Sequence, residues 1–200
     1  MTTDGEARIG QRALIGGLAA SLALAGCGAR LEPLPSPWRP GSRLDAQVPT
    51  LDAYLDVTNA HTGERVALRF ASGGNMDRRA LRRLDWLFRD WRQGRSPEID
   101  PRLYWALAAL SQQARQAGQS GRVTLLSGYR TRRTNATLQR NGAASNSYHM
   151  RRRAADIRLE GLPMPAVADH AEWLGIGGVG RYPGSDFTHI DSGPPRTWAG

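Results

Sequence analysis

The order of strand-like and helix-like segments constrains the fold of this chain most. Apolar residues alternate or form short runs where strands are expected, and recur every three to four residues where helices are expected. The predicted strands are a hairpin in 51–70, single strands at 123–126 and 154–159, and a pair at 179–182 and 187–191. The predicted helices are 76–91, 101–116 and 163–174, and residues 131–141 fit a polar helix or a loop. Because strands and helices come in separate runs, the sequence predicts an α+β fold.

The N-terminal segment is predicted to direct export. Arg8 and Arg12 precede the apolar run 13–25, which is shorter than the ~20 residues of a membrane span and typical of a signal peptide. The run ends in Leu-Ala-Gly-Cys, the pattern of a lipobox, in which Cys27 would carry a lipid. We therefore expect residues 1–26 to be a lipoprotein signal peptide.

A proline-rich stretch follows the lipidation site. Residues 28–50 contain repeated prolines and no apolar period, which predicts a semi-extended linker. We therefore expect Cys27 and its linker in 27–50 and one folded domain in 51–200. The protein would then be periplasmic and held to a membrane by the lipid on Cys27.

The charge of the chain indicates anionic surroundings. The formal net charge is +9, and every basic residue is an arginine. The arginines are scattered and no nucleic-acid-binding motif accompanies them, so we expect an anionic wall polymer or lipid rather than nucleic acid. The single cysteine excludes an internal disulfide.

Two of the four histidines lie in unusual company. His149 precedes Asp156 by seven residues, and His189 lies on a predicted strand. Two histidines and one carboxylate can hold zinc and leave a fourth position open, as catalytic zinc sites do. By spacing alone the metal signal is weak, because two histidines and an aspartate occur in many proteins as core or surface residues. His61 is interpreted as a turn residue and His170 as a packing residue.

The surrounding motifs make the interpretation more specific. Ser147-x-His149-x-x-Arg152-x-Ala154-x-Asp156 resembles the SxHxxGxAxD signature of zinc D-Ala-D-Ala peptidases of the VanY/VanX type, and Asp186-x-x-His189 resembles their ExxH signature. That superfamily includes the lysostaphin-like and Hedgehog domains. Further segments are similar to the YcbK-like (MepK) murein endopeptidases: 59–64, 89–92, 127–130, 177–180 and 185–191.

The resemblance implies a fold and a set of roles. The fold would be a central, mostly antiparallel sheet flanked by helices, as in Hedgehog and D-Ala-D-Ala peptidase domains. His149, Asp156 and His189 would bind Zn²⁺. Asp186 would take a proton from the zinc-bound water, and Arg130 would bind or polarise the substrate.

Two positions depart from the family pattern. Arg152 stands where the signature has glycine, so a long cation could distort the turn or gate the cleft. Asp186 replaces a glutamate and, on a regular strand, would face away from His189 unless the preceding turn moves it. Asp191 shares the face of His189 and is the alternative base, or else a hydrogen-bond partner of that ligand.

Together these features predict a monomeric zinc-dependent murein endopeptidase that acts on the peptide stems of peptidoglycan. The bond could be D-Ala to diaminopimelate or diaminopimelate to diaminopimelate. The alternatives are a D,D-carboxypeptidase, and a non-catalytic peptidoglycan-binding lipoprotein that keeps the fold. A nucleic-acid-binding module is disfavoured by the export signal.

Overall fold

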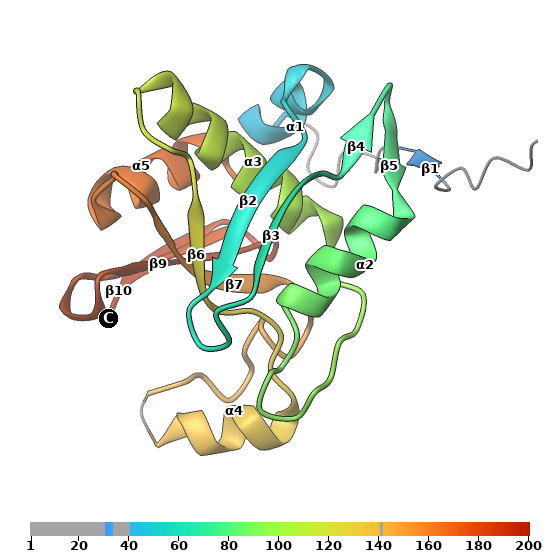
Figure 1. Cartoon of the computed structure of the whole chain (residues 1–200). Coiled ribbons are helices and arrows are strands. Elements are labelled where there is room, and N and C mark those ends of the chain that lie inside the picture. Colours follow the sequence, from blue (N-terminus) through green and yellow to red (C-terminus); the bar gives the residue numbers. More distant parts are fainter. Residues whose placement is uncertain (1–30, 34–40, 141) are drawn as a thin grey trace, which may run out of the picture.

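A seven-stranded sheet organises the part of the chain that this computed structural model describes, residues 31–33, 41–140 and 142–200 (Figure 1). The strands are, in spatial order, β10 (Arg196–Ala199), β8 (Gly178–Tyr182), β9 (Phe187–Asp191), β7 (Ala154–Leu159), β6 (Val123–Ser127), β2 (Tyr54–Asn59) and β3 (Arg65–Arg69). β10 runs parallel to β8 and β2 parallel to β6, while the other neighbours are antiparallel. The predicted α+β class with a mostly antiparallel central sheet is confirmed.

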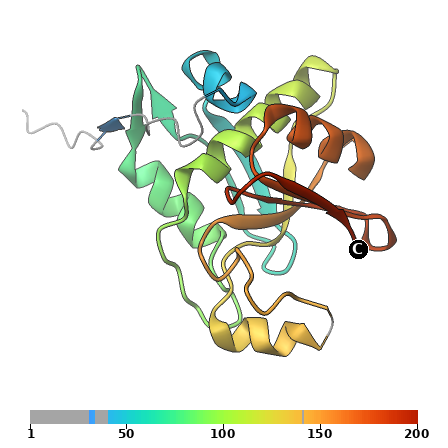
Figure 2. The same cartoon turned by 180° about the vertical axis from the view of Figure 1, so that it is seen from behind.

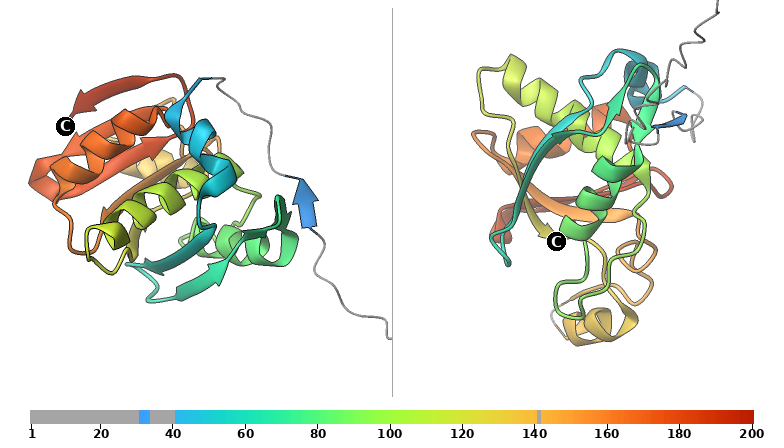
Figure 3. Two further views of the ribbon diagram at one scale, coloured as in Figure 1. Left: turned by 90° about the horizontal axis from the view of Figure 1, so that it is seen from above. Right: turned by 45° about the vertical axis from the view of Figure 1, so that its right-hand side comes forward.

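Three helices lie against one face of this sheet: α1 (Arg43–Gln47), α3 (Pro101–Gln116) and α5 (Met164–Leu174) (Figure 3). α3 has the predicted bounds, because Asp100 caps its first turn by accepting from Arg102 N and Pro101 occupies the first helical position. Leu107 on α3 and Ile157 on β7 are fully buried in the core between helix and sheet. Burial of such apolar surface is the main force that holds α3 and α5 on the sheet. No helix among the described residues is both long enough and apolar enough to cross a membrane.

The second predicted helix is shorter than expected. α2 (Arg78–Leu87) begins only after Asp77, whose carboxylate accepts from the backbone N–H groups of Arg79 and Ala80. Met76 instead belongs to β5 (Asn75–Asp77), which pairs with β4 (Ala71–Ser72) and β1 (Leu31–Pro33) in a small separate sheet. Trp91 lies beyond the helix, in a turn. The spacing of apolar residues therefore predicted a helix that is too long at both ends.

The end of the predicted linker is folded. Residues 43–50 form α1 and the short 3-10 helix Val48–Thr50, and Leu44 is fully buried in the main core. Asp45 forms a buried ion pair with Arg102 of α3. A single helical turn held by one leucine and one ion pair has no apolar period, so the sequence pattern did not reveal it. The predicted signal peptide, Cys27 and the residues 34–40 of the linker lie outside the described residues.

The C-terminal end contains a strand that was not predicted, β10, and residues 131–141 contain the helix α4 (Arg132–Gln139). α4 stands apart from α1, α3 and α5, at the opposite end of the molecule (Figures 1 and 2). The sheet therefore has two different faces. Ala155, Ile157 and Ile190 point into the core on the helical side, and their strand neighbours point to the side on which α4 lies.

Asp85 of α2 is a buried carboxylate whose titration makes the stability of the fold depend on pH. Its Oδ1 accepts from Ile99 N at 3.0 Å and from the Tyr104 hydroxyl at 2.8 Å, and burial raises its pKa from 3.8 to about 6. A raised pKa means that the folded state binds the proton more tightly, so stability falls as the pH rises from about 4 through 6.

We expect Asp85→Asn to remove most of this pH dependence, because an amide oxygen can accept both hydrogen bonds without carrying a charge. Between about pH 4 and about pH 8, the wild type should lose on the order of 1–3 kcal/mol more unfolding free energy than the variant. Urea unfolding at both pH values measures this difference. Equal losses in the two proteins would contradict the assignment.

Candidate metal centre and its pocket

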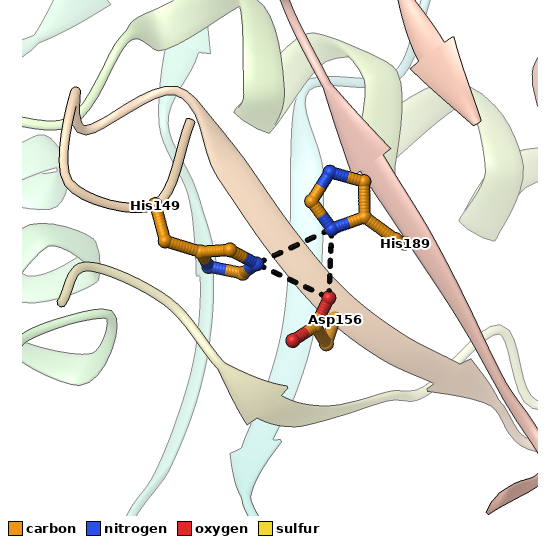
Figure 4. Close-up of side chains that lie close together, drawn as sticks. All are labelled: His149, Asp156 and His189. Carbon is orange, nitrogen blue, oxygen red and sulfur yellow. Dashed lines mark hydrogen bonds and ion pairs between the residues drawn. The ribbon is translucent and has the colours of Figure 1, made fainter. Parts of the chain in front are cut away.

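The strand register places two of the predicted ligands side by side. Asp156 on β7 is the direct cross-strand partner of His189 on β9, so both side chains leave the same face of the sheet. Asp156 Oδ1 lies 2.9 Å from His189 Nδ1. His149 Nε2 lies 3.2 Å from each of these atoms, and all three residues are buried (Figure 4). The structure thus brings the three predicted metal ligands together.

His149 reaches the cluster from a tight turn that precedes β7. The Ser147 hydroxyl accepts from His149 N, and the chain folds back so that Arg152 N donates to His149 O. The ring Nδ1 lies 2.7 Å from Gly128 O, and a carbonyl can only accept, so Nδ1 carries the hydrogen. Position 128 must be glycine, because a Cβ there would collide with the Phe88 carbonyl. The other ring nitrogen, Nε2, is therefore left to face the cluster.

His189 is fixed in the same way by a carboxylate behind it. Its Nε2 lies 3.1 Å from Asp191 Oδ2, which leaves Nδ1 to face Asp156 and His149. Asp191 is fully buried and also accepts from Gly178 N, Gly193 N and the Arg196 guanidinium. Burial alone would raise the pKa of Asp191, but the hydrogen bonds from His189 and Arg196 hold that pKa well below its ordinary range. An ionised Asp191 is a strong acceptor that orients the ring.

The three inward-facing atoms suit a metal cation. Each is an acceptor, and acceptors that face one another without a cation or a proton between them repel. Ligands at about 2.0–2.2 Å from a tetrahedral zinc lie about 3.3–3.5 Å apart, close to the 2.9–3.2 Å found here. The donor set therefore fits a divalent metal such as zinc.

The pKa shifts of His149 and Asp156 agree with this chemistry, whereas the shift of His189 favours a protonated ring, whose proton a metal would have to replace. Burial lowers the pKa of His149, which favours the neutral ring that a metal needs. Burial alone would raise the pKa of Asp156, but the neighbouring histidines hold it well below its ordinary value, so the carboxylate is ionised. For His189 burial acts to lower the pKa, but the hydrogen bonds to Asp156 and Asp191 outweigh it and raise the pKa.

Arg130 lies at the edge of the cluster. It forms an ion pair with Asp156 Oδ2, and its Nε donates to the Ser127 hydroxyl at 2.7 Å. The guanidinium is mostly buried yet lines the pocket. It therefore holds the Asp156 carboxylate in place, while its predicted contact with substrate stays a prediction.

A pocket of about 600 Å³ opens above the three ligands. One wall is aromatic, because Tyr182 stacks on Phe187 at 4.3 Å between ring centroids and the Trp198 indole donates to the Tyr182 hydroxyl. Trp198 can lie close to His189 because the intervening β8 residue is Gly180, where a Cβ would collide with the indole. The other wall contains Arg130 and residues 142–144 and 146–148, which follow α4.

The structure places Asp186 outside the pocket above the three candidate ligands, so its predicted role as the base stays a prediction. Its side chain is 73% exposed, lies 3.9 Å from the Arg158 guanidinium and lines a different pocket together with Thr188. Thr188 and His189 are adjacent on β9 and point to opposite faces, and Asp186 stays on the side of Thr188. Its backbone is left-handed, with φ 47°, but this turn does not bring the carboxylate to the cluster.

The alternative residue, Asp191, is a hydrogen-bond partner of His189. It lies behind the ring, on the side away from Asp156, and so cannot reach a water held between the ligands. Among the described residues that line the pocket, Asp156 is the one carboxylate.

Arg152 keeps the backbone that the signature glycine would have. Its φ is 63°, in the left-handed region, and its side chain is exposed and outside the pocket lining. The predicted distortion or gating by a long cation is not seen. Arg152 O instead accepts from Asp100 N, which ties the turn to the start of α3.

Sequence reasoning missed part of the pocket wall. Trp198 and Arg196 lie on the unpredicted strand β10, and Tyr148 lies beside His149. A signal existed in the alternation of Arg196 and Trp198, but four residues are too few to identify a strand. His61 lies in a turn, as expected, and stacks on Trp91, while His170 stacks on Trp173, in line with the expected surface or packing residue.

Comparison with known proteins identifies the family. The family described as peptidoglycan L,D-endopeptidase MepK matches residues 50–198. The chain belongs to this family. A relative from Haemophilus influenzae, named probable peptidoglycan L,D-endopeptidase MepK, is 38% identical over 73% of this chain and 78% of its own length. The Escherichia coli K12 protein, named peptidoglycan L,D-endopeptidase MepK, is 38% identical over 72% of this chain and 79% of its own.

We expect Arg152→Gly to stabilise the protein by about 1 kcal/mol, because glycine adopts a left-handed backbone without the clash that a Cβ causes. Urea unfolding measures the change. Arg151→Gly, at a position without positive φ, is the matched control and should destabilise. A destabilised Arg152→Gly variant would show that the arginine side chain has a structural role.

We expect Asp191→Asn to weaken zinc binding about 10–100-fold, because a neutral amide cannot orient His189 as the ionised carboxylate does. Competition with a chromogenic chelator measures the affinity. The control is Asp186→Asn, which should bind zinc as the wild type does. If Asp191→Asn binds zinc with wild-type affinity, the Asp191 carboxylate is not needed to orient His189 for metal binding.

Proposed function

We propose that the protein is a zinc-dependent peptidoglycan endopeptidase that hydrolyses an amide bond in the cross-linked peptide stems of the cell wall. The observation that carries the proposal is the convergence of His149, Asp156 and His189 on one point at the floor of an open pocket. Family membership and the names of the relatives supply the substrate. Those names also favour a bond between an L-configured and a D-configured residue.

The residues of the chain divide the work of catalysis. Zinc bound by the three ligands would polarise the scissile carbonyl and lower the pKa of a bound water to about 7. Gly128 O and Asp191 hold the two imidazoles in the tautomers that present their free nitrogens. Arg130 keeps Asp156 in place and directs its remaining N–H groups into the pocket, where they can hydrogen bond to the substrate.

The wider setting follows from the sequence. We propose that residues 1–26 direct export and that Cys27 carries a lipid, so that a monomeric domain works in the periplasm while held to a membrane. The net charge of +9 supports work beside an anionic wall. We also propose that the sheet and its helices correspond to the fold shared by D-Ala-D-Ala peptidases and Hedgehog domains, since the ligands lie on adjacent antiparallel strands and the turn before them.

We expect His149→Ala to abolish both zinc binding and the digestion of purified sacculi, because one of three ligands is lost. Asp186→Ala should digest sacculi at a rate within about twofold of the wild type, because its side chain lies outside the pocket. Mass spectrometry of the released muropeptides measures both effects and identifies the bond.

Each alternative function has its own result in that experiment. Wild-type protein that sediments with sacculi but releases nothing would be a wall-binding module, and release of single terminal amino acids would indicate a carboxypeptidase. Digestion by His149→Ala would overturn the metal site. Loss of digestion in Asp186→Ala would restore Asp186 as a base that moves into the pocket.

A further inference from the structure

A second, smaller cavity adjoins the pocket above the metal ligands. Its volume is about 370 Å³, and Arg130, Asn146 and Ser147 line both spaces. The rest of its lining is Tyr129, Arg132, Met150 and Arg151. Because the same three residues line both spaces, a ligand that extends past them from the pocket would meet the second cavity.

The cavity is cationic. Three guanidinium groups line it and its lining contains no carboxylate. Arg130 is neutralised by Asp156, but Arg151 donates only to the neutral Asn146 Oδ1, at 2.7 Å. Arg132 makes no hydrogen bond or ion pair with another described residue. Two positive charges therefore remain without a counter-charge within the described part of the chain.

The charge of Arg132 lies at an electrostatically unfavourable position in α4. This arginine is the first residue of α4, directly after the N-cap Thr131, where the helix dipole disfavours a cation. Asp90 accepts a hydrogen bond from Thr131 N at 2.9 Å, which fixes the position of this end of α4. The arginine therefore does not stabilise α4, whose end already has the carboxylate of Asp90, and an anion in the cavity would pair with the guanidinium.

The proposed substrate offers such an anion. In a cross-link that includes diaminopimelate, a residue flanking the scissile amide keeps a free carboxylate. A guanidinium binds a carboxylate through two parallel hydrogen bonds, which fixes orientation as well as charge.

We infer that Arg132 and Arg151 form a subsite for the free carboxylate of the diamino acid beside the scissile amide, and that this subsite selects against cross-links in which that carboxyl is amidated. The inference rests on the proposed function and adds its substrate specificity. Arg132 and Arg151 would act in substrate binding, and neither belongs to the group of candidate metal ligands.

The test uses two synthetic cross-linked peptides that differ only in whether this carboxyl is free or amidated. Zinc-loaded wild type should cleave the free-carboxylate peptide with a kcat/KM about tenfold or more above that for the amide, mainly through KM. Arg132→Gln and Arg151→Gln should each lose most of this preference, so that the ratio of the two kcat/KM values falls toward one.

Arg133→Gln is the matched control, since Arg133 is the next residue of α4 and does not line the cavity. Arg133→Gln should keep the full preference for the free-carboxylate peptide, because the preference depends on the arginines that line the cavity and not on the total positive charge. The subsite is overturned if wild type cleaves both peptides equally, or if Arg133→Gln and Arg132→Gln behave alike.

Failure of the proposed function gives a different result. If wild type cleaves neither peptide, the peptidase assignment fails, and calorimetry of the same peptides with His149→Ala tests the subsite alone. Tighter binding of the free-carboxylate peptide, lost in the double variant His149→Ala with Arg132→Gln, would support the subsite. Equal binding of both peptides would overturn it.

Discussion

The cross-strand pairing of Asp156 with His189 is the constraint on which the rest of the site depends. A shift of one residue between β7 and β9 would send one of the two side chains to the helical face of the sheet. The register is protected because Ala155, Ile157 and Ile190 on the same strands are buried against the helices. The apolar core thus also fixes the geometry of the metal ligands, and a slip would expose apolar groups and bury charged ones.

Burial of the ligands demands further partners. Moving two imidazoles and a carboxylate out of water destabilises the folded state unless each of their polar atoms has a hydrogen-bond or ionic partner. Gly128 O, Asp191 and Arg130 provide those partners on the outer side, and the inner side is left for a cation. Asp191 is in turn held by backbone N–H groups and by Arg196 of β10. The last strand of the sheet therefore supports the centre although it carries no ligand.

Much of this could be predicted from the sequence, where local pattern and tertiary structure agree. α3, β7 and β9 have strong periodicity or clear caps, and the ligand triad followed from motif spacing. α1 and β10 could not be found, because each is a few residues long and is held by contacts with distant parts of the chain, such as the Asp45–Arg102 pair and the alignment of Arg196 with Gly178.

Asp186 shows that motif spacing alone does not fix the direction of a side chain. The family spacing favoured Asp186, while strand alternation placed it on the wrong face, and the structure follows the alternation. A motif records which residues recur, but the direction of a side chain depends on the local backbone, which the turn at 183–185 did not redirect.

The pocket has chemically different walls, and this difference limits what can bind productively. Tyr182, Phe187 and Trp198 offer flat apolar surfaces with few hydrogen-bonding groups, whereas the opposite wall leads to arginines. Arg196 also lines the aromatic side, but its guanidinium is paired with Asp191, so the positive charge without a counter-charge lies on the side of Arg132 and Arg151. Under the proposed subsite, this asymmetry would orient the cross-link across His149, Asp156 and His189. Selectivity for the bond would then come from the two walls of the pocket, because the proposed metal chemistry could act on any amide.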